Sequence, residues 1–358
     1  MSFKPSLRDV LPDRLQEPAR AVLVSREELL AGTPWFVRAL IGAGAWFASF
    51  FLMFFLALAV VVGKEVGAII IGLIIIAGAI ALRHQSPGVF LTQLLLASSL
   101  AGQGLVIGGM ALLSKHSESQ AAFVTVVLQT ALLFLYPDTV QRFLSGLFAS
   151  SALLILLRLV VPGVLVDVAL VGVTLGIHLL FLHQGQLQAT RWGELVTPAA
   201  FGLVLTLLWE LVARTWGRDS LLELFGEKQF PLPPGVLTLG ITAVTLSSVW
   251  HVLRELGAET RGSVGPAVLA ALGLTAVLTL QTPGVITALG LMALGFHRRS
   301  ALLLGMAVVF ILVFGASYYY DIQLSLLAKS LALLGSGLVC LGARLFILRR
   351  LPALEEVA

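Results

Sequence analysis

The chain alternates between long apolar runs and very short polar breaks, and the pattern repeats about twelve times along its 358 residues. An apolar stretch of about 18 or more residues with few charges is long enough to cross a bilayer as a helix. Hydrophobic residues make up 58% of the sequence and charged residues only 12%, so little of the chain is left for a soluble domain. The sequence therefore predicts an all-α, polytopic integral membrane bundle of about twelve transmembrane helices.

The short polar breaks divide this bundle into recognisable segments. We predict a cytoplasmic N-terminal arm over 1–34, one transmembrane helical domain over 35–348 with an outer amphipathic loop at 217–234, and a cytoplasmic tail over 349–358. The shortest run, 284–296, is either a full span, a half-helix or a re-entrant hairpin. The predicted spans are approximately 35–62, 66–82, 89–113, 121–136, 142–161, 164–182, 195–215, 235–253, 264–281, 284–296, 300–319 and 322–347.

Basic residues are distributed unevenly between alternate loops. If the N-terminus is inside, 16 of the 23 Lys and Arg residues fall on the cytoplasmic side, 6 fall outside, and Lys329 lies within a span. Loops rich in Lys and Arg stay in the cytoplasm, so both termini are predicted to be cytoplasmic. The net charge of +4 is explained by this orientation signal and predicts no nucleic-acid partner.

Lys329 is the clearest ionisable residue inside a predicted span. A charge in a span costs roughly 2.5–3.5 kcal/mol on insertion scales, so it needs a reason. Acidic residues at a similar depth are Glu210, Asp167 and Asp321. Lys329 either pairs with one of them or extends outward to the lipid headgroups. Glu210 also has a local alternative, because Arg214 lies four residues further along the same helix.

Polar residues form a stripe on two neighbouring spans. Thr92, Ser99 and Gln103 are spaced by seven and four residues, which places them on one helical face. Thr125 and Gln129 are again four apart in the next span. Such groups either hydrogen-bond between helices or line a path for a polar substrate. The sequence favours the first interpretation and leaves the second open.

Two glycines beside this stripe, Gly104 and Gly108, have the GxxxG spacing. This spacing lets two helix backbones approach closely in a membrane. We therefore expect a close interhelical contact at these glycines.

His178 lies in the middle of the sixth predicted span, but nothing around it resembles a metal site. His183 follows at a spacing of five residues rather than the four of paired helical zinc ligands. The single cysteine, Cys340, excludes cysteine-based clusters. A nucleophile elbow, a phosphate-binding loop and a dinucleotide loop are all missing from the sequence. We therefore predict no metal, no cofactor and no catalytic residues, and an enzyme is disfavoured.

Two stretches of the chain are similar to a known family. The first is Pro34-Trp35-Phe36-Val37-Arg38, followed by Gly42, Gly44, Ala45 and Trp46; the second is Tyr319-Tyr320, followed by Leu324, Leu326-Leu327, Lys329-Ser330 and Gly335. Both resemble an uncharacterised bacterial membrane family, domain of unknown function 4401, and the related family 2157 shares the first motif. The resemblance implies a multispan protein of the bacterial inner membrane. It also implies gene neighbours that include a small membrane-anchored protein with a Gly-Asp-Tyr motif, and it carries no activity with it.

Two hypotheses on function follow from these observations. The first is a membrane-embedded subunit of unknown activity that binds a small envelope partner. The second is a secondary transporter or flippase for a small or lipid-linked solute, with Gln103, Gln129 and His178 lining its cavity. A membrane enzyme that acts on lipid is a weaker third.

Overall fold

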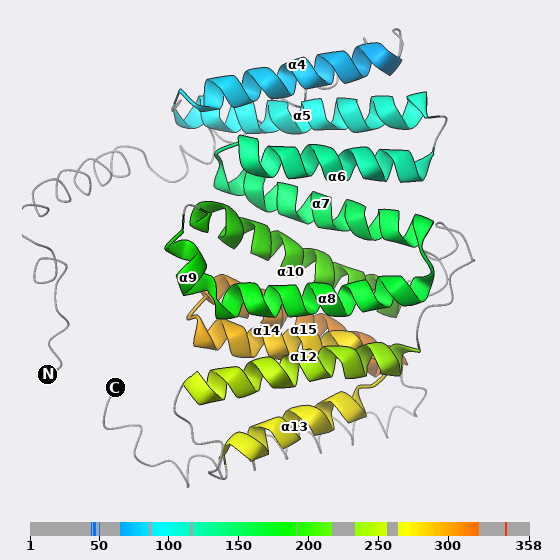
Figure 1. Cartoon of the computed structure of the whole chain (residues 1–358), viewed down its shortest axis with the longest axis vertical. Coiled ribbons are helices and arrows are strands. Elements are labelled where there is room, and N and C mark those ends of the chain that lie inside the picture. The colour runs from blue at the N-terminus through cyan, green and yellow to red at the C-terminus, as the bar shows by residue number, and fades with distance from the viewer. Residues whose placement is uncertain are drawn as a thin grey trace, which may run out of the picture. The chain divides into compact units, whose positions relative to one another are not determined.

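The computed structural model describes residues 44, 46–47, 50, 65–85, 88–114, 117–190, 192–216, 233–255, 264–321 and 341. Within these residues the regular elements are helices and no strand is present (Figure 1). The predicted all-α class is therefore confirmed for this part of the chain. The arm 1–34, the tail 349–358, Lys329 and nearly all of the loop 217–234 lie outside the described residues.

The helices follow the predicted apolar runs closely, from the run at 66–82 to the run at 300–319. In chain order they are α4 (Glu65–Arg83), α5 (Val89–Leu113), α6 (Glu118–Leu135), α7 (Thr139–Val160), α8 (Gly163–Leu182), α9 (Gln184–Gln188), α10 (Gly193–Trp216), α12 (Pro234–Glu255), α13 (Val264–Leu278), α14 (Pro283–His297) and α15 (Ala301–Asp321).

Seven of these helices, α4–α8, α10 and α12, are long and apolar enough to cross a membrane by length and composition. The short run at 284–296 is α14, a helix of 15 residues, and α13 has the same length. At 1.5 Å per residue each extends about 22 Å, which is less than the hydrocarbon core of about 30 Å. The structure supports a multi-pass membrane protein without fixing the number of spans at twelve.

The chain divides into two compact units, Met1–Leu156 and Leu157–Ala358, and the boundary falls inside α7. In the first unit, α4 and α5 pack against each other along their length (Figure 1). Their backbones approach most closely at Gly72 and Gly102. A Cβ atom on Gly72 would lie 2.6 Å from the Gly102 carbonyl oxygen, and one on Gly102 would lie 2.8 Å from the Gly72 carbonyl oxygen. Glycine at both positions is therefore a condition of this contact.

The expected contact is wrong at Gly108, which is exposed and where an added Cβ atom would meet nothing within 4 Å. At Gly104 a close contact stays a prediction. Gly102 and Gly109 face α4 instead, and a Cβ atom on Gly109 would lie 3.0 Å from the Glu65 carbonyl oxygen. A spacing of seven residues returns to the same helical face after two turns, which is why these two glycines share it.

In the second unit, α14 packs between α12 and α15, and α12 also packs against α8 (Figure 1). The link between α13 and α14 is held by its neighbours. Thr238 of α12 donates its hydroxyl to the Leu280 carbonyl oxygen at 2.8 Å. Gly284 lies directly under the Phe314 ring, with which an added Cβ atom would collide. Irregular backbone at membrane depth needs such protein partners for its polar groups.

Candidate functional site

The most extensive charged site of the described chain is an ionic network of four residues in the second unit. The Arg158 guanidinium contacts the Glu210 carboxylate. Glu210 also accepts a hydrogen bond from Arg214 Nε at 3.3 Å, and Arg214 Nη1 contacts Asp167. Two arginines and two carboxylates thus alternate, and their formal charges sum to zero. We call these four side chains the ionic network.

Three helix ends bring the ionic network together. Arg158 and Arg214 lie in the last turns of α7 and α10, and Asp167 lies near the start of α8. Cations near a helix C-terminus interact favourably with the helix dipole. Asp167 is fully buried, and the two arginine side chains are about one-fifth exposed. A buried carboxylate needs a partner of opposite charge, and Arg214 supplies it.

Glu210 and Asp167, predicted from the sequence as members of an intramembrane charge cluster, are therefore brought together. Lys329 lies outside the described residues and nothing is described of the Asp321 side chain, so a pair with either stays a prediction. The local pairing of Glu210 with Arg214 is confirmed. Arg158 was not predicted, because an arginine at the end of an apolar run gives no signal beyond the bias of basic residues between loops.

The polar stripe of the first unit is largely an interhelical hydrogen-bond network. Gln129 of α6 donates its side-chain amide to Gln103 Oε1 of α5 at 2.8 Å. Gln103 in turn donates to the Ser99 hydroxyl at 3.1 Å. All three side chains are buried, and only Gln129 Oε1 has no hydrogen-bond partner among the described residues. This arrangement matches the interhelical interpretation of the stripe.

The two threonines of the stripe lie apart from this network. Thr92 receives a hydrogen bond from Arg83 Nη1 at 3.4 Å, and Arg83 pairs with Asp138 at 3.0 Å. Thr125 donates its hydroxyl to the carbonyl oxygen of Ala121 in its own helix at 2.8 Å. The predicted stripe is thus divided between a helix-end ion pair, a buried network and a local backbone bond.

His178 belongs to the second unit and lies between α8, α12 and α14. Its Nδ1 atom is 2.8 Å from the Thr174 carbonyl oxygen, so this nitrogen carries the proton and Nε2 is an acceptor in the neutral ring. His178 Nε2 and the Thr245 hydroxyl are both buried, and neither has a hydrogen-bond partner among the described residues. Both face Gly290, where an added Cβ atom would lie 3.0 Å from each.

A family model for a domain of unknown function, DUF4401, matches residues 34–350. The chain belongs to the DUF4401 family. The match covers the ionic network, the glutamine network and His178, so all three lie in the family's own domain. No curated protein and no solved structure matches the chain. The predicted family is thus confirmed, whereas the relation to family 2157 stays a prediction.

This DUF4401 chain also gathers histidines at the ends of α8, α12 and α14. The rings of His183 and His251 have centroids 6.5 Å apart. The Glu255 carboxylate lies 3.4 Å from His251 Nε2 and 3.0 Å from His297 Nε2. No three His, Cys, Asp or Glu residues in the described part of the chain have a geometry that could hold a metal ion. The sequence signal for this group was weak, since these histidines are spread over more than a hundred residues.

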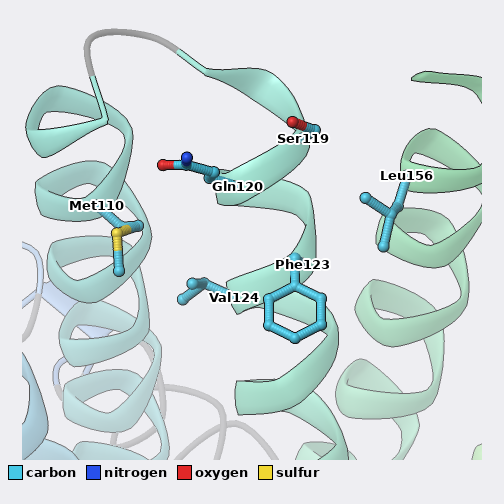
Figure 2. Close-up of a pocket in the computed structure, with 6 residues that line it drawn as sticks. All are labelled: Met110, Ser119, Gln120, Phe123, Val124 and Leu156. Carbon is cyan, nitrogen blue, oxygen red and sulfur yellow. The ribbon is translucent and has the colours of Figure 1, made fainter. Parts of the chain in front are cut away.

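The first unit of the DUF4401 chain has one further feature, an open depression of about 500 Å³ (Figure 2). Its walls come from α5, α6 and α7 and are mainly apolar. It is lined by Met110, Ser119, Gln120, Phe123, Val124 and Leu156. A depression of this kind has no charged group to orient a polar substrate, but it can receive an apolar side chain or an acyl chain.

Proposed function

We propose that this DUF4401 protein is a membrane-embedded subunit that binds a small membrane-anchored partner and does not itself form a path for solutes. The observation that carries the proposal is the bond between Gln129 and Gln103. These were the residues best placed to line a polar cavity. They join α5 to α6 instead, and both side chains are buried, so they are not open to a passing solute.

The proposal includes a location and an orientation. We place the protein in the bacterial inner membrane, with about twelve spans and both termini in the cytoplasm. The bias of Lys and Arg toward one set of loops supports this arrangement. Reporter fusions at Ala358 and within 217–234 should report opposite sides of the membrane. A periplasmic Ala358 would refute the twelve-span arrangement but leave the subunit role open.

The partner is proposed to be a small membrane-anchored protein with a Gly-Asp-Tyr motif. Its hydrophobic anchor would pack beside α6, where the depression in Figure 2 offers an apolar surface. Phe123 lies in this depression and its side chain is 57% exposed. A photo-crosslinking residue at Phe123 should capture such a partner when the two proteins are co-expressed.

Phe134 provides the matched control. It is also a phenylalanine of α6 and is 53% exposed, but it does not line the depression. Crosslinking at Phe123 and not at Phe134 would support the proposal. Equal crosslinking at both positions would indicate unspecific proximity, and no co-purification of the two proteins in mild detergent would refute the partner.

Transport is the second candidate function, and one observation favours it. His178 and Thr245 face each other across Gly290 in the interior of the second unit without hydrogen-bond partners among the described residues. Unsatisfied polar groups near the centre of a bundle are typical of transporter sites beside short or broken helices. The short helices α13 and α14 add to this resemblance.

Cysteine accessibility separates the two functions. In a Cys340→Ser background, Thr245→Cys should remain unreactive toward a membrane-impermeant thiol reagent if the protein is a packed subunit. Rapid labelling from either side would demonstrate an aqueous route and favour transport. His84→Cys is the positive control, because His84 is exposed just beyond the end of α4.

A further inference from the structure

The end of the second unit where α8, α12 and α14 finish carries a group of basic side chains that the proposed function does not use. We propose that this end binds the phosphate group of an anionic phospholipid, with Arg299 as a principal cation. The inference depends on the protein being embedded in a membrane. It does not depend on the partner or on transport.

The backbone at Arg299 is the first piece of evidence. Arg299 has φ 51°, and it is the one non-glycine residue with positive φ in the described part of the chain. Its N–H bonds to the Phe296 carbonyl oxygen at 3.2 Å, and the Ser300 N–H bonds to the Gly295 carbonyl oxygen at 3.0 Å. This is a Schellman motif, in which the left-handed position is normally glycine.

An arginine at this position is strained, whereas a glycine would adopt the same conformation freely. Residues held in a left-handed conformation concentrate at sites where the side chain has a function. The Schellman motif uses only the backbone of residue 299, and glycine would form it equally well. What arginine adds at this position is a positively charged side chain.

The neighbouring side chains are the second piece of evidence. Arg254, in the last turn of α12, is exposed like Arg299. Arg298 donates to the Leu182 carbonyl oxygen at the end of α8, which ties α14 to α8. Glu255, the one carboxylate of this group among the described residues, lies beside His251 and His297. Three arginines against one carboxylate leave an excess positive charge that suits a phosphate.

The apolar side chains next to this group distinguish a lipid from a free phosphate. Trp250 lies one turn before the last turn of α12, Phe296 lies in the last turn of α14, and the two residues are 43% and 65% exposed. Tryptophan concentrates where hydrocarbon meets the headgroups. A phospholipid can place its phosphate against Arg299 and Arg254 and its glycerol and acyl chains against these rings. A free phosphate has no use for them.

The test is lipid binding by the purified full chain in mild detergent, followed by native mass spectrometry. We expect tighter retention of phosphatidylglycerol than of phosphatidylcholine. Each basic residue near an anionic membrane surface contributes about 1 kcal/mol, which corresponds to a factor of about five in binding. Arg299→Gly should therefore weaken phosphatidylglycerol binding about five-fold, and Arg254→Gln with Arg299→Gly should weaken it further.

Two controls separate a binding role from a structural one. Arg299→Gly removes backbone strain, so its thermal stability in phosphatidylcholine should equal or exceed that of the wild type. Glu255→Gln removes the opposing charge and should strengthen phosphatidylglycerol binding. Wild-type phosphatidylglycerol retention by Arg299→Gly would overturn the proposal. Displacement of the lipid by millimolar inorganic phosphate would overturn the lipid assignment in favour of a free-phosphate site.

Discussion

The close contact between α4 and α5 leaves no room for a side chain at Gly72. Gly72→Ala would place a Cβ atom 2.6 Å from the Gly102 carbonyl oxygen and 2.8 Å from Val106 Cγ2. Close contacts between carbon and a carbonyl oxygen in proteins lie at about 3.3–3.6 Å. The two backbones would therefore have to separate by about 0.7 Å, because a carbonyl oxygen within a helix cannot rotate away.

A separation of this size loses part of the dispersion energy along the whole contact, roughly a quarter to a half for each affected atom pair. Overpacking of this kind costs typically about 1–3 kcal/mol. Alanine also gains about 1 kcal/mol over glycine from helix propensity, which partly hides the cost. Gly78→Ala corrects for that gain, because Gly78 lies in the same helix and a Cβ atom there meets nothing within 4 Å.

The assay is equilibrium unfolding in mixed micelles, or thermal unfolding if the transition is irreversible. We expect Gly72→Ala to be less stable than Gly78→Ala by about 1–3 kcal/mol. Gly102→Ala should lower the stability about as much as Gly72→Ala does. The loss in the double variant should be smaller than the sum of the two single losses, because both substitutions push apart the same pair of helices. Equal stability of Gly72→Ala and Gly78→Ala would refute the close contact.

Three further predictions concern buried contacts elsewhere. Gln129→Leu removes the donor to Gln103 and should destabilise the first unit by about 1–3 kcal/mol, measured by the same unfolding assay; wild-type stability would contradict the network. Asp167→Asn removes the charge that faces Arg214 in the ionic network, and a loss of about 1.5–3 kcal/mol is expected for a hydrogen bond to a charged group. In Gly284→Ala the added Cβ atom would collide with the Phe314 ring, so the melting temperature should fall, and Phe314→Leu in the same chain should restore part of it. An unchanged melting temperature in Gly284→Ala would refute the packing of Gly284 against Phe314.

The helices themselves were well determined by the sequence. The predicted run at 89–113 is α5 with the same limits, and the run at 164–182 differs from α8 by one residue. Long apolar stretches and their polar breaks are local properties, and backbone groups in a membrane must bond within their own segment. A stretch of about 20 apolar residues therefore has few alternatives to a helix, and no tertiary information is needed to locate it.

The sequence also carried the polar stripe, though only in part. It placed Gln103 and Gln129 in two successive spans, each on a polar face of its helix, and the two side chains do bond to each other. It could not separate Thr92 from them, because the Arg83 side chain that Thr92 meets belongs to a different helix.

Only the tertiary structure decided which face of each helix meets protein. The helices are apolar on nearly all sides, so hydropathy does not distinguish a surface facing lipid from one facing another helix. Gly104 and Gly108 have the better motif, yet Gly102 and Gly109 make the contact with α4. Likewise, Glu210 had an evident local partner in Arg214, but its pairing with Arg158 depends on where the last turn of α7 lies. The rotation of each helix about its own axis is fixed by the helix that packs against it, and one sequence does not show which helix that is.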